Sequence, residues 1–243
     1  MASLLLSAAP AAAQTTFHLG VRGGLNRAST TLADASNSAS TTTYFSADKS
    51  GIFAWQAGVV LEARFGKLAL QPAVLFSQKG EKFTTGAATK YLIGTGTTST
   101  TSTNRYDWLE VPVNLVYTSH TDHGWQVLAG PYIAVAVGGK QRGTTTGYSL
   151  NGTYGYYATD FDKQVLYGSQ YNNRRLDAGL NFGLGYRQGP WQVQATYSLG
   201  LLNLRQPSDS FVIIEYPQFN HDFEADPAYN RVAQLTGTYF FAL

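Results

Sequence analysis

The chain has 243 residues, a formal net charge of +2 and no cysteine. Its length suits one large β domain, and the absence of Cys excludes disulfides, thiolate metal sites and a lipid-anchor cysteine. Charged residues make up 13% of the chain, aromatic residues 14%, and there are 25 Gly and 16 Tyr. Because the few basic residues are scattered, we predict no nucleic-acid partner. Many aromatics and glycines with few charges instead suit a tightly turning chain that contacts lipid.

The N-terminus carries a short apolar stretch at 4–13 that ends in Ala11, Ala12 and Ala13. A small-x-small site after an apolar run predicts a signal peptide over residues 1–13 and a mature barrel domain over 14–243. The basic residues that usually precede such a run are missing, so an Ala-rich leader is the alternative. No other segment reaches the roughly 18 continuous apolar residues of a membrane helix. We therefore expect an exported protein without a helical anchor.

Large apolar residues alternate with small or polar ones along most of the chain. Alternation with period two is typical of β-strands that have one apolar and one polar face. A tilted strand needs about 9–11 residues to cross a bilayer. Eight such runs are present, at 17–27, 51–64, 68–80, 106–118, 125–138, 176–187, 191–202 and 230–243.

The connections between these runs alternate strictly between short and long. The short ones lie around 65–67, 119–124 and 188–190, and the long ones span 28–50, 81–105, 139–175 and 203–229. Short periplasmic turns and long extracellular loops are typical of outer-membrane barrels. The pattern predicts an all-β, eight-stranded, antiparallel up-and-down transmembrane barrel in the outer membrane. The alternatives are a soluble lipocalin-like carrier or a β-sandwich, which would both expose the polar face instead.

Aromatic residues of the apolar faces gather next to the short turns. An aromatic belt at one level indicates a membrane interface, so we expect a girdle that contacts outer-membrane lipid. Its predicted members are Phe65, Tyr117, Trp125, Tyr186, Trp191, Tyr239 and Phe241. The aromatic-rich last strand resembles the signal read by the barrel-insertion machinery, although the chain ends in Leu243 rather than an aromatic residue.

Several of these runs resemble the PorT-like outer-membrane β-barrel family of Bacteroidota. The resemblance rests on segments 17–26, 70–80, 108–117, 129–132, 180–186 and 197–203, and most distinctively on Leu-Gln-Pro at 70–72 followed by Leu-Glu-Val-Pro at 109–112. It implies a small membrane barrel, and one member of the family is linked to protein secretion. We expect a structural, surface-binding or secretion-accessory role, with possible secretion or surface partners.

Five charged residues fall on the polar faces of the runs and are predicted to lie in the lumen. An eight-stranded barrel is filled by its own side chains, which argues against a porin. Buried charges require partners, so we expect an ion-pair network with Arg22 and Glu62 as its preferred pair; a proton or ion path is the alternative. The predicted members are Arg22, Glu62, Arg64, Glu110 and Asp177.

The long loops are the candidate binding regions. The third loop carries Tyr148, Tyr154, Tyr156 and Tyr157 among Gly and Asn, a mixture typical of adaptable recognition surfaces. Strands that extend beyond the membrane would explain the same residues. The Thr-rich segment 95–103 is expected to be mobile.

Enzyme chemistry has little support in the sequence, and we predict neither catalysis nor a cofactor or metal. No catalytic motif is present, although Asp209, Ser210, His221 and Asp222 of the last loop could converge in a barrel hydrolase. His120 and His123 flank Asp122 and could hold a divalent metal, but we favour an ordinary polar turn in which the histidines are incidental.

Overall fold

The computed structural model describes residues 15–31, 38–39, 43–91, 94–149, 155–168, 173–205 and 227–242. The predicted signal peptide lies outside these residues. The strands are β1 (Thr16–Thr30), β2 (Ser38–Ala39), β3 (Thr43–Phe65), β4 (Leu68–Tyr91), β5 (Gly94–Thr118), β6 (His123–Ser149), β7 (Gly155–Gln164), β8 (Leu176–Gln188), β9 (Trp191–Gly200) and β10 (Asn230–Ala242). In this part of the chain, no helix is long and apolar enough to cross a membrane.

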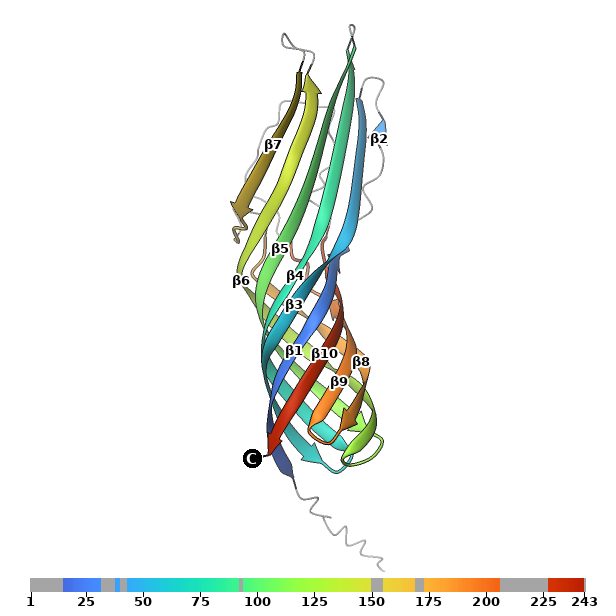
Figure 1. Cartoon of the computed structure of the whole chain (residues 1–243), viewed down its shortest axis with the longest axis vertical. Helices are drawn as coiled ribbons and strands as arrows, with labels where there is room; N and C mark the ends of the chain where they lie inside the picture. Colours follow the sequence, from blue (N-terminus) through green and yellow to red (C-terminus); the bar gives the residue numbers. More distant parts are fainter. Residues whose placement is uncertain are drawn as a thin grey trace, which may run out of the picture.

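The strands close into a ring because β1 pairs with β10 on one side and with β3 on the other. The ring runs β1-β3-β4-β5-β6-β8-β9-β10, every pairing is antiparallel, and β2 and β7 lie outside it (Figure 1). The predicted eight-stranded up-and-down barrel is confirmed.

The wall of this barrel is apolar outside and polar inside. Along β9, Trp191 and Val193 are exposed while Gln192, Gln194 and Ser198 are buried. This polarity is the reverse of a lipocalin, in which the interior is apolar and the outside polar. The soluble carrier and the β-sandwich are therefore both wrong, and the exposed apolar surface requires lipid around it.

All three short turns lie at one end of the barrel, together with the C-terminal end of β10 (Figure 1). Gly66 and Gly189 occupy the turns 66–67 and 189–190 with φ of 62° and 56°, a conformation that glycine adopts without steric cost. The structure places all seven predicted girdle residues on the outer face near this end. Some touch across strands, since the rings of Trp125 and Tyr186 lie 5.5 Å apart and those of Trp191 and Tyr239 4.7 Å apart.

At the opposite end, four strands continue far beyond the ring. Strands β3 to β6 have 23, 24, 25 and 27 residues, more than twice the roughly 10 that cross a bilayer. Their distal parts form, with β7, an open antiparallel sheet that projects from the barrel mouth (Figure 1). We call it the extension sheet, comprising residues 43–51, 81–91, 94–105, 139–149 and 155–164.

Much of the predicted loop at 28–50, 81–105 and 139–175 is therefore strand, and the expectation of a mobile segment at 95–103 is wrong. Residues 95–103 pair with β4, and residues 97–103 pair with β6 as well. The hydroxyls of Thr100 and Thr145 lie 3.0 Å apart and those of Thr84 and Thr101 3.4 Å apart. Threonine favours strands, but a sheet that is polar on both faces lacks the apolar alternation by which strands are recognised.

Irregular register marks the transition from barrel to extension sheet. The register of β3 on β4 shifts between Gly51 and Gln56, and that of β5 on β6 shifts at Asp107 and Trp108. One extra residue reverses which alternate residues face inward, as in a β-bulge. On β6 the inward residues are Tyr132, Ala134 and Ala136 below the shift, and odd-numbered residues such as Gln141 above it.

Candidate functional site

The lumen near the turn end is organised around Glu62, whose side chain is fully buried. One of its carboxylate oxygens lies 2.8 Å from Nη1 of Arg187, and the other lies 3.3 Å from Nε of Arg64. His18 approaches the same carboxylate at 3.3 Å, and Gln71 donates a 2.7 Å hydrogen bond to it. We call these residues, with Arg22, the Glu62 cluster.

Arg22 belongs to this cluster but does not pair with Glu62, so the predicted Arg22–Glu62 ion pair is wrong. Its guanidinium donates to Thr238 at 2.9 Å and to Gln194 at 3.1 Å. The register sets Glu62 opposite His18 and Arg22 opposite Gly58. Four residues of strand separate the two levels by about 13 Å, at about 3.3 Å per residue.

Amide side chains fill the space that the charged groups leave. Gln71 and Gln192 exchange hydrogen bonds in both directions, at 3.0 and 3.2 Å. Gln126 donates to Gln192 at 3.3 Å and to Thr118 at 3.1 Å. Because these residues come from β4, β5, β6 and β9, the network joins opposite walls and occupies the cross-section of the lumen.

A second polar cluster lies nearer the mouth and is centred on Lys79. Its ammonium group lies 2.7 Å from a carboxylate oxygen of Glu110 and 3.5 Å from one of Asp177. Asp177 also accepts hydrogen bonds from Tyr132 at 3.1 Å and from Asn230 at 2.7 Å. All five side chains are buried. We call this group the Lys79 cluster.

The structure thus places all five predicted lumen charges inside, but divides them between the two clusters. Sequence reasoning missed Lys79 and Arg187, the main cations of the clusters. Both residues continue the set of alternate residues that face inward on their strands. On β4 this set includes Gln71, Ser77 and Lys79, and on β8 it runs from Asp177 through several glycines to Arg187. Each lies at the end of its run, where a charged residue looks like the start of a loop.

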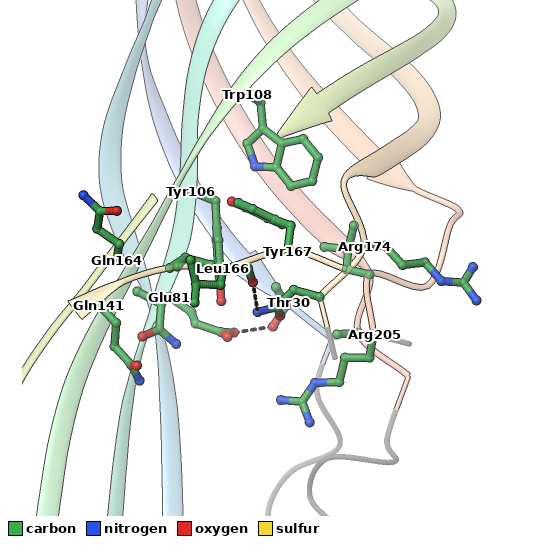
Figure 2. A pocket seen from close by; sticks show the side chains of 15 residues that line it. Thr30, Glu81, Tyr106, Trp108, Gln141, Gln164, Leu166, Tyr167, Arg174 and Arg205 are labelled. Atoms are coloured by element: carbon green, nitrogen blue, oxygen red, sulfur yellow. Dashed lines mark hydrogen bonds between the residues drawn. The ribbon is translucent and has the colours of Figure 1, made fainter. Parts of the chain in front are cut away.

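Above the Lys79 cluster, the barrel mouth contains a pocket of about 360 Å³. Trp108 lies at its inner end, and the rings of Tyr106 and Tyr167 lie beside it (Figure 2). Glu81 accepts a hydrogen bond from Thr30 on its wall. The remaining described residues of the lining are Asn104, Gln141, Gln164, Val165, Leu166, Asn173, Arg174, Leu204, Arg205 and Ala228.

The connection that follows β7 supplies five of the lining residues, and two of these form hydrogen bonds to backbone carbonyls. Tyr167 donates a 2.7 Å hydrogen bond to the carbonyl of Gly138, and Asn173 donates a 3.1 Å bond to the carbonyl of Leu166. Burial, followed by the nearby carboxylate of Asp107, raises the pKa of Tyr167 above its usual range. Its phenol therefore remains protonated and keeps its role as a donor at physiological pH.

Residues 12–206 of the chain match the family described as the outer membrane protein beta-barrel domain. The chain belongs to this family. No curated protein matches it. Family membership agrees with the outward apolar surface, so this is an outer-membrane barrel protein. The match identifies the broad family, and the narrower PorT-like relationship remains a prediction.

The predicted binding tyrosines of this outer-membrane barrel lie far from the mouth pocket, on the extension sheet. Tyr148 and Tyr156 are cross-strand neighbours on β6 and β7, and both are exposed. Tyr157 lies on the opposite face, next to Gly147. Tyr154 lies outside the described residues. These three positions agree with strands that extend beyond the membrane.

The other candidate residues, for a hydrolase site and for a metal site, form no site within the described part of the chain. Asp209, Ser210, His221 and Asp222 lie outside the described residues. The rings of His120, in the turn after β5, and His123, the first residue of β6, stack at 4.9 Å. Across the described ranges, no group of three His, Cys, Asp or Glu residues is arranged to hold a metal ion.

Proposed function

We propose that this outer-membrane protein is a non-porin barrel that binds a small extracellular ligand in its mouth pocket. Among structural, surface-binding and secretion-accessory roles, surface binding has the most support. The observation that carries it is the position of the pocket: it opens at the loop end and ends at Trp108, directly above the Lys79 cluster. A ligand that enters there meets a closed floor instead of a channel.

The chemistry of the lining favours a ring-shaped ligand that carries hydroxyl groups and an acidic group. The pocket volume is at the small end of the range of about 300–1,000 Å³ found for ligand sites. Tyrosine and tryptophan offer flat apolar faces with a polar edge, and amide side chains both donate and accept hydrogen bonds. Arg205 adds a cation that suits a carboxylate, whereas the Arg174 side chain points away from the pocket (Figure 2). A sugar acid combines these features, and we propose binding rather than catalysis.

The buried Trp108 provides a direct test of this proposal. Trp55, Trp125 and Trp191 face outward and are exposed, so replacing these three by Phe leaves Trp108 as the single fluorescent reporter at the pocket. In this background we expect glucuronic acid to change the emission in a saturable way, and glucose to do so more weakly. The titration is followed with the refolded full-length protein in detergent micelles.

A matched pair of variants locates the binding. Tyr106→Ala removes a pocket ring and should abolish the saturable change, whereas Tyr156→Ala removes an exposed ring of the extension sheet and should leave it intact. The proposal fails if neither sugar gives a saturable change, or if Tyr106→Ala responds as the parent does.

The filled lumen predicts that the protein does not conduct ions. Reconstituted in planar bilayers, it should give no stepwise conductance under conditions in which a porin does. Regular steps in several independent preparations would show that the two clusters do not close the lumen.

A secretion-accessory role is a second proposal and rests on the resemblance of 70–72 and 109–112 to the PorT-like family. Deleting the gene should then reduce specific proteins in the culture medium. An unchanged set of secreted proteins would argue against it. Export itself is proposed to use residues 1–13, and N-terminal sequencing of the membrane form should begin at Gln14.

A further inference from the structure

The exposed apolar residues on the outer face of the barrel form a band. At the loop end of the barrel, basic residues lie along the edge of this band. On β5, the exposed Leu109 is followed along the outer face by Asp107 and then by Arg105, and on β6 the exposed Val137 is followed by Lys140. Arg27 has the corresponding position on β1, where its guanidinium lies 5.6 Å from the ring centre of Phe53.

Four cations gather on the outer face where β4, β5 and β6 enter the extension sheet. Arg105 lies directly opposite Lys140 in the register of β5 and β6. In the next row on the same face, Thr103 lies between Lys82 on β4 and Arg142 on β6. The four cations therefore surround the position of Thr103. We call Lys82, Arg105, Lys140 and Arg142 the basic patch.

Asp48, Asp107 and Asp160 lie in neighbouring rows of the same face, but within the described residues Arg142 is the one member of the basic patch that forms an ion pair. Arg142 forms an exposed ion pair with Asp162 at 2.9 Å, and Arg105 donates to the carbonyl of Phe53 at 3.3 Å. Lys82 and Lys140 form no ion pair with any residue in the described ranges. Like charges directly opposite each other on a sheet are destabilising, as for Arg105 and Lys140. A bound anion would turn this repulsion into charge-assisted hydrogen bonding.

Beyond the basic patch, the same face of the extension sheet has an open hollow of about 600 Å³. Its chemistry changes from cations to hydroxyl and carboxylate groups, and Thr144 donates a 2.6 Å hydrogen bond to Asp160 there. Such groups suit a ligand rich in hydroxyls, because carboxylates accept and threonines both donate and accept. The described lining is Lys82, Thr101, Thr103, Arg142, Gly143, Thr144, Asp160, Phe161 and Asp162.

We propose that the basic patch and the hollow bind the phosphorylated headgroup of an outer-leaflet glycolipid. The order along the barrel axis matches the order within such a lipid. The apolar band would contact the acyl chains, the basic patch the phosphate groups, and the hydroxyl-lined hollow the sugar. Basic residues immediately beyond a membrane-spanning segment attract anionic headgroups, so both position and charge agree with this partner. This site is separate from the mouth pocket on the inner face.

The test titrates the full-length protein, released in detergent, with lipid A and follows the bound lipid by native mass spectrometry. We expect lipid A that keeps its phosphates to bind at least about ten-fold more tightly than the same lipid after phosphatase treatment. Arg105→Gln with Lys140→Gln should weaken binding by a similar factor. Lys82→Gln with Arg142→Gln provides a second, independent pair.

Lys67→Gln is the matched control, since Lys67 is exposed in the turn at the opposite end of the barrel. It should bind lipid A as the wild type does, and every variant should keep the heat-modifiable gel shift of a folded barrel. The proposal is overturned if phosphatase-treated lipid or both double variants bind as tightly as their parents. Two further results would also overturn the proposal. If inorganic phosphate bound as tightly as lipid A, the ligand would be a soluble anion. If phosphatidylglycerol bound as tightly as lipid A, the site would recognise any anionic lipid surface.

Discussion

Replacing Glu62 by alanine is expected to destabilise the folded barrel by about 3–5 kcal/mol, the usual cost of breaking a buried ion pair. Glu62 is the one carboxylate that the Glu62 cluster offers to Arg64 and Arg187, at 3.3 and 2.8 Å. Its removal leaves both guanidinium groups inside the lumen without an ionic partner. An uncompensated buried charge costs far more than the pair itself contributes.

The measurement is urea unfolding in lipid vesicles, with the heat-modifiable gel shift as the readout of folded protein. Glu62→Gln should lie between the wild type and Glu62→Ala, because an amide still accepts a hydrogen bond but carries no charge. Asp162→Ala is the matched control: it breaks the exposed Arg142–Asp162 pair and should cost about 0–1 kcal/mol. Equal stability of Glu62→Ala and Asp162→Ala would contradict a structural role for the Glu62 cluster.

The sequence predicts the barrel well because period-two alternation identifies both the strands and their inner faces. Arg22, Glu62 and Asp177 could be placed in the lumen by alternation alone, and the structure buries all three. Which of them meet could not be derived in this way. Contacts depend on the register between strands, and the Arg22–Glu62 pair failed because the register offsets these residues by four positions.

The extension sheet escaped prediction for a different physical reason. Inside the bilayer, one face of a strand must be apolar, so the alternation is strong. Beyond the bilayer both faces meet water, and rows such as Thr85, Thr100 and Thr145 carry the same polar residue type across neighbouring strands. The register shift next to Val137 makes the prediction harder still. One extra residue reverses which alternate residues face inward, and no residue type in the sequence identifies its position.

Replacing Lys79 by methionine is expected to be about as destabilising as the loss of Glu62, at about 3–5 kcal/mol. Methionine approximates the length of the lysine side chain but leaves Glu110 and Asp177 without a cation. The other groups that contact Asp177, Tyr132 and Asn230, are neutral hydrogen-bond donors. We therefore expect the loss at neutral pH, again measured by urea unfolding in vesicles.

A combined variant separates the effect of charge from that of packing in this cluster. Adding Glu110→Gln and Asp177→Asn should bring the stability at neutral pH to within about 1 kcal/mol of the wild type, because neutral groups replace buried ion pairs at little cost. A deficit that persists in the combined variant would show that Lys79 acts through packing, for example against the ring of Tyr132 at 4.7 Å. The expected result instead assigns the Lys79 cluster the role of a charge-balanced plug, which closes the lumen beneath the mouth pocket.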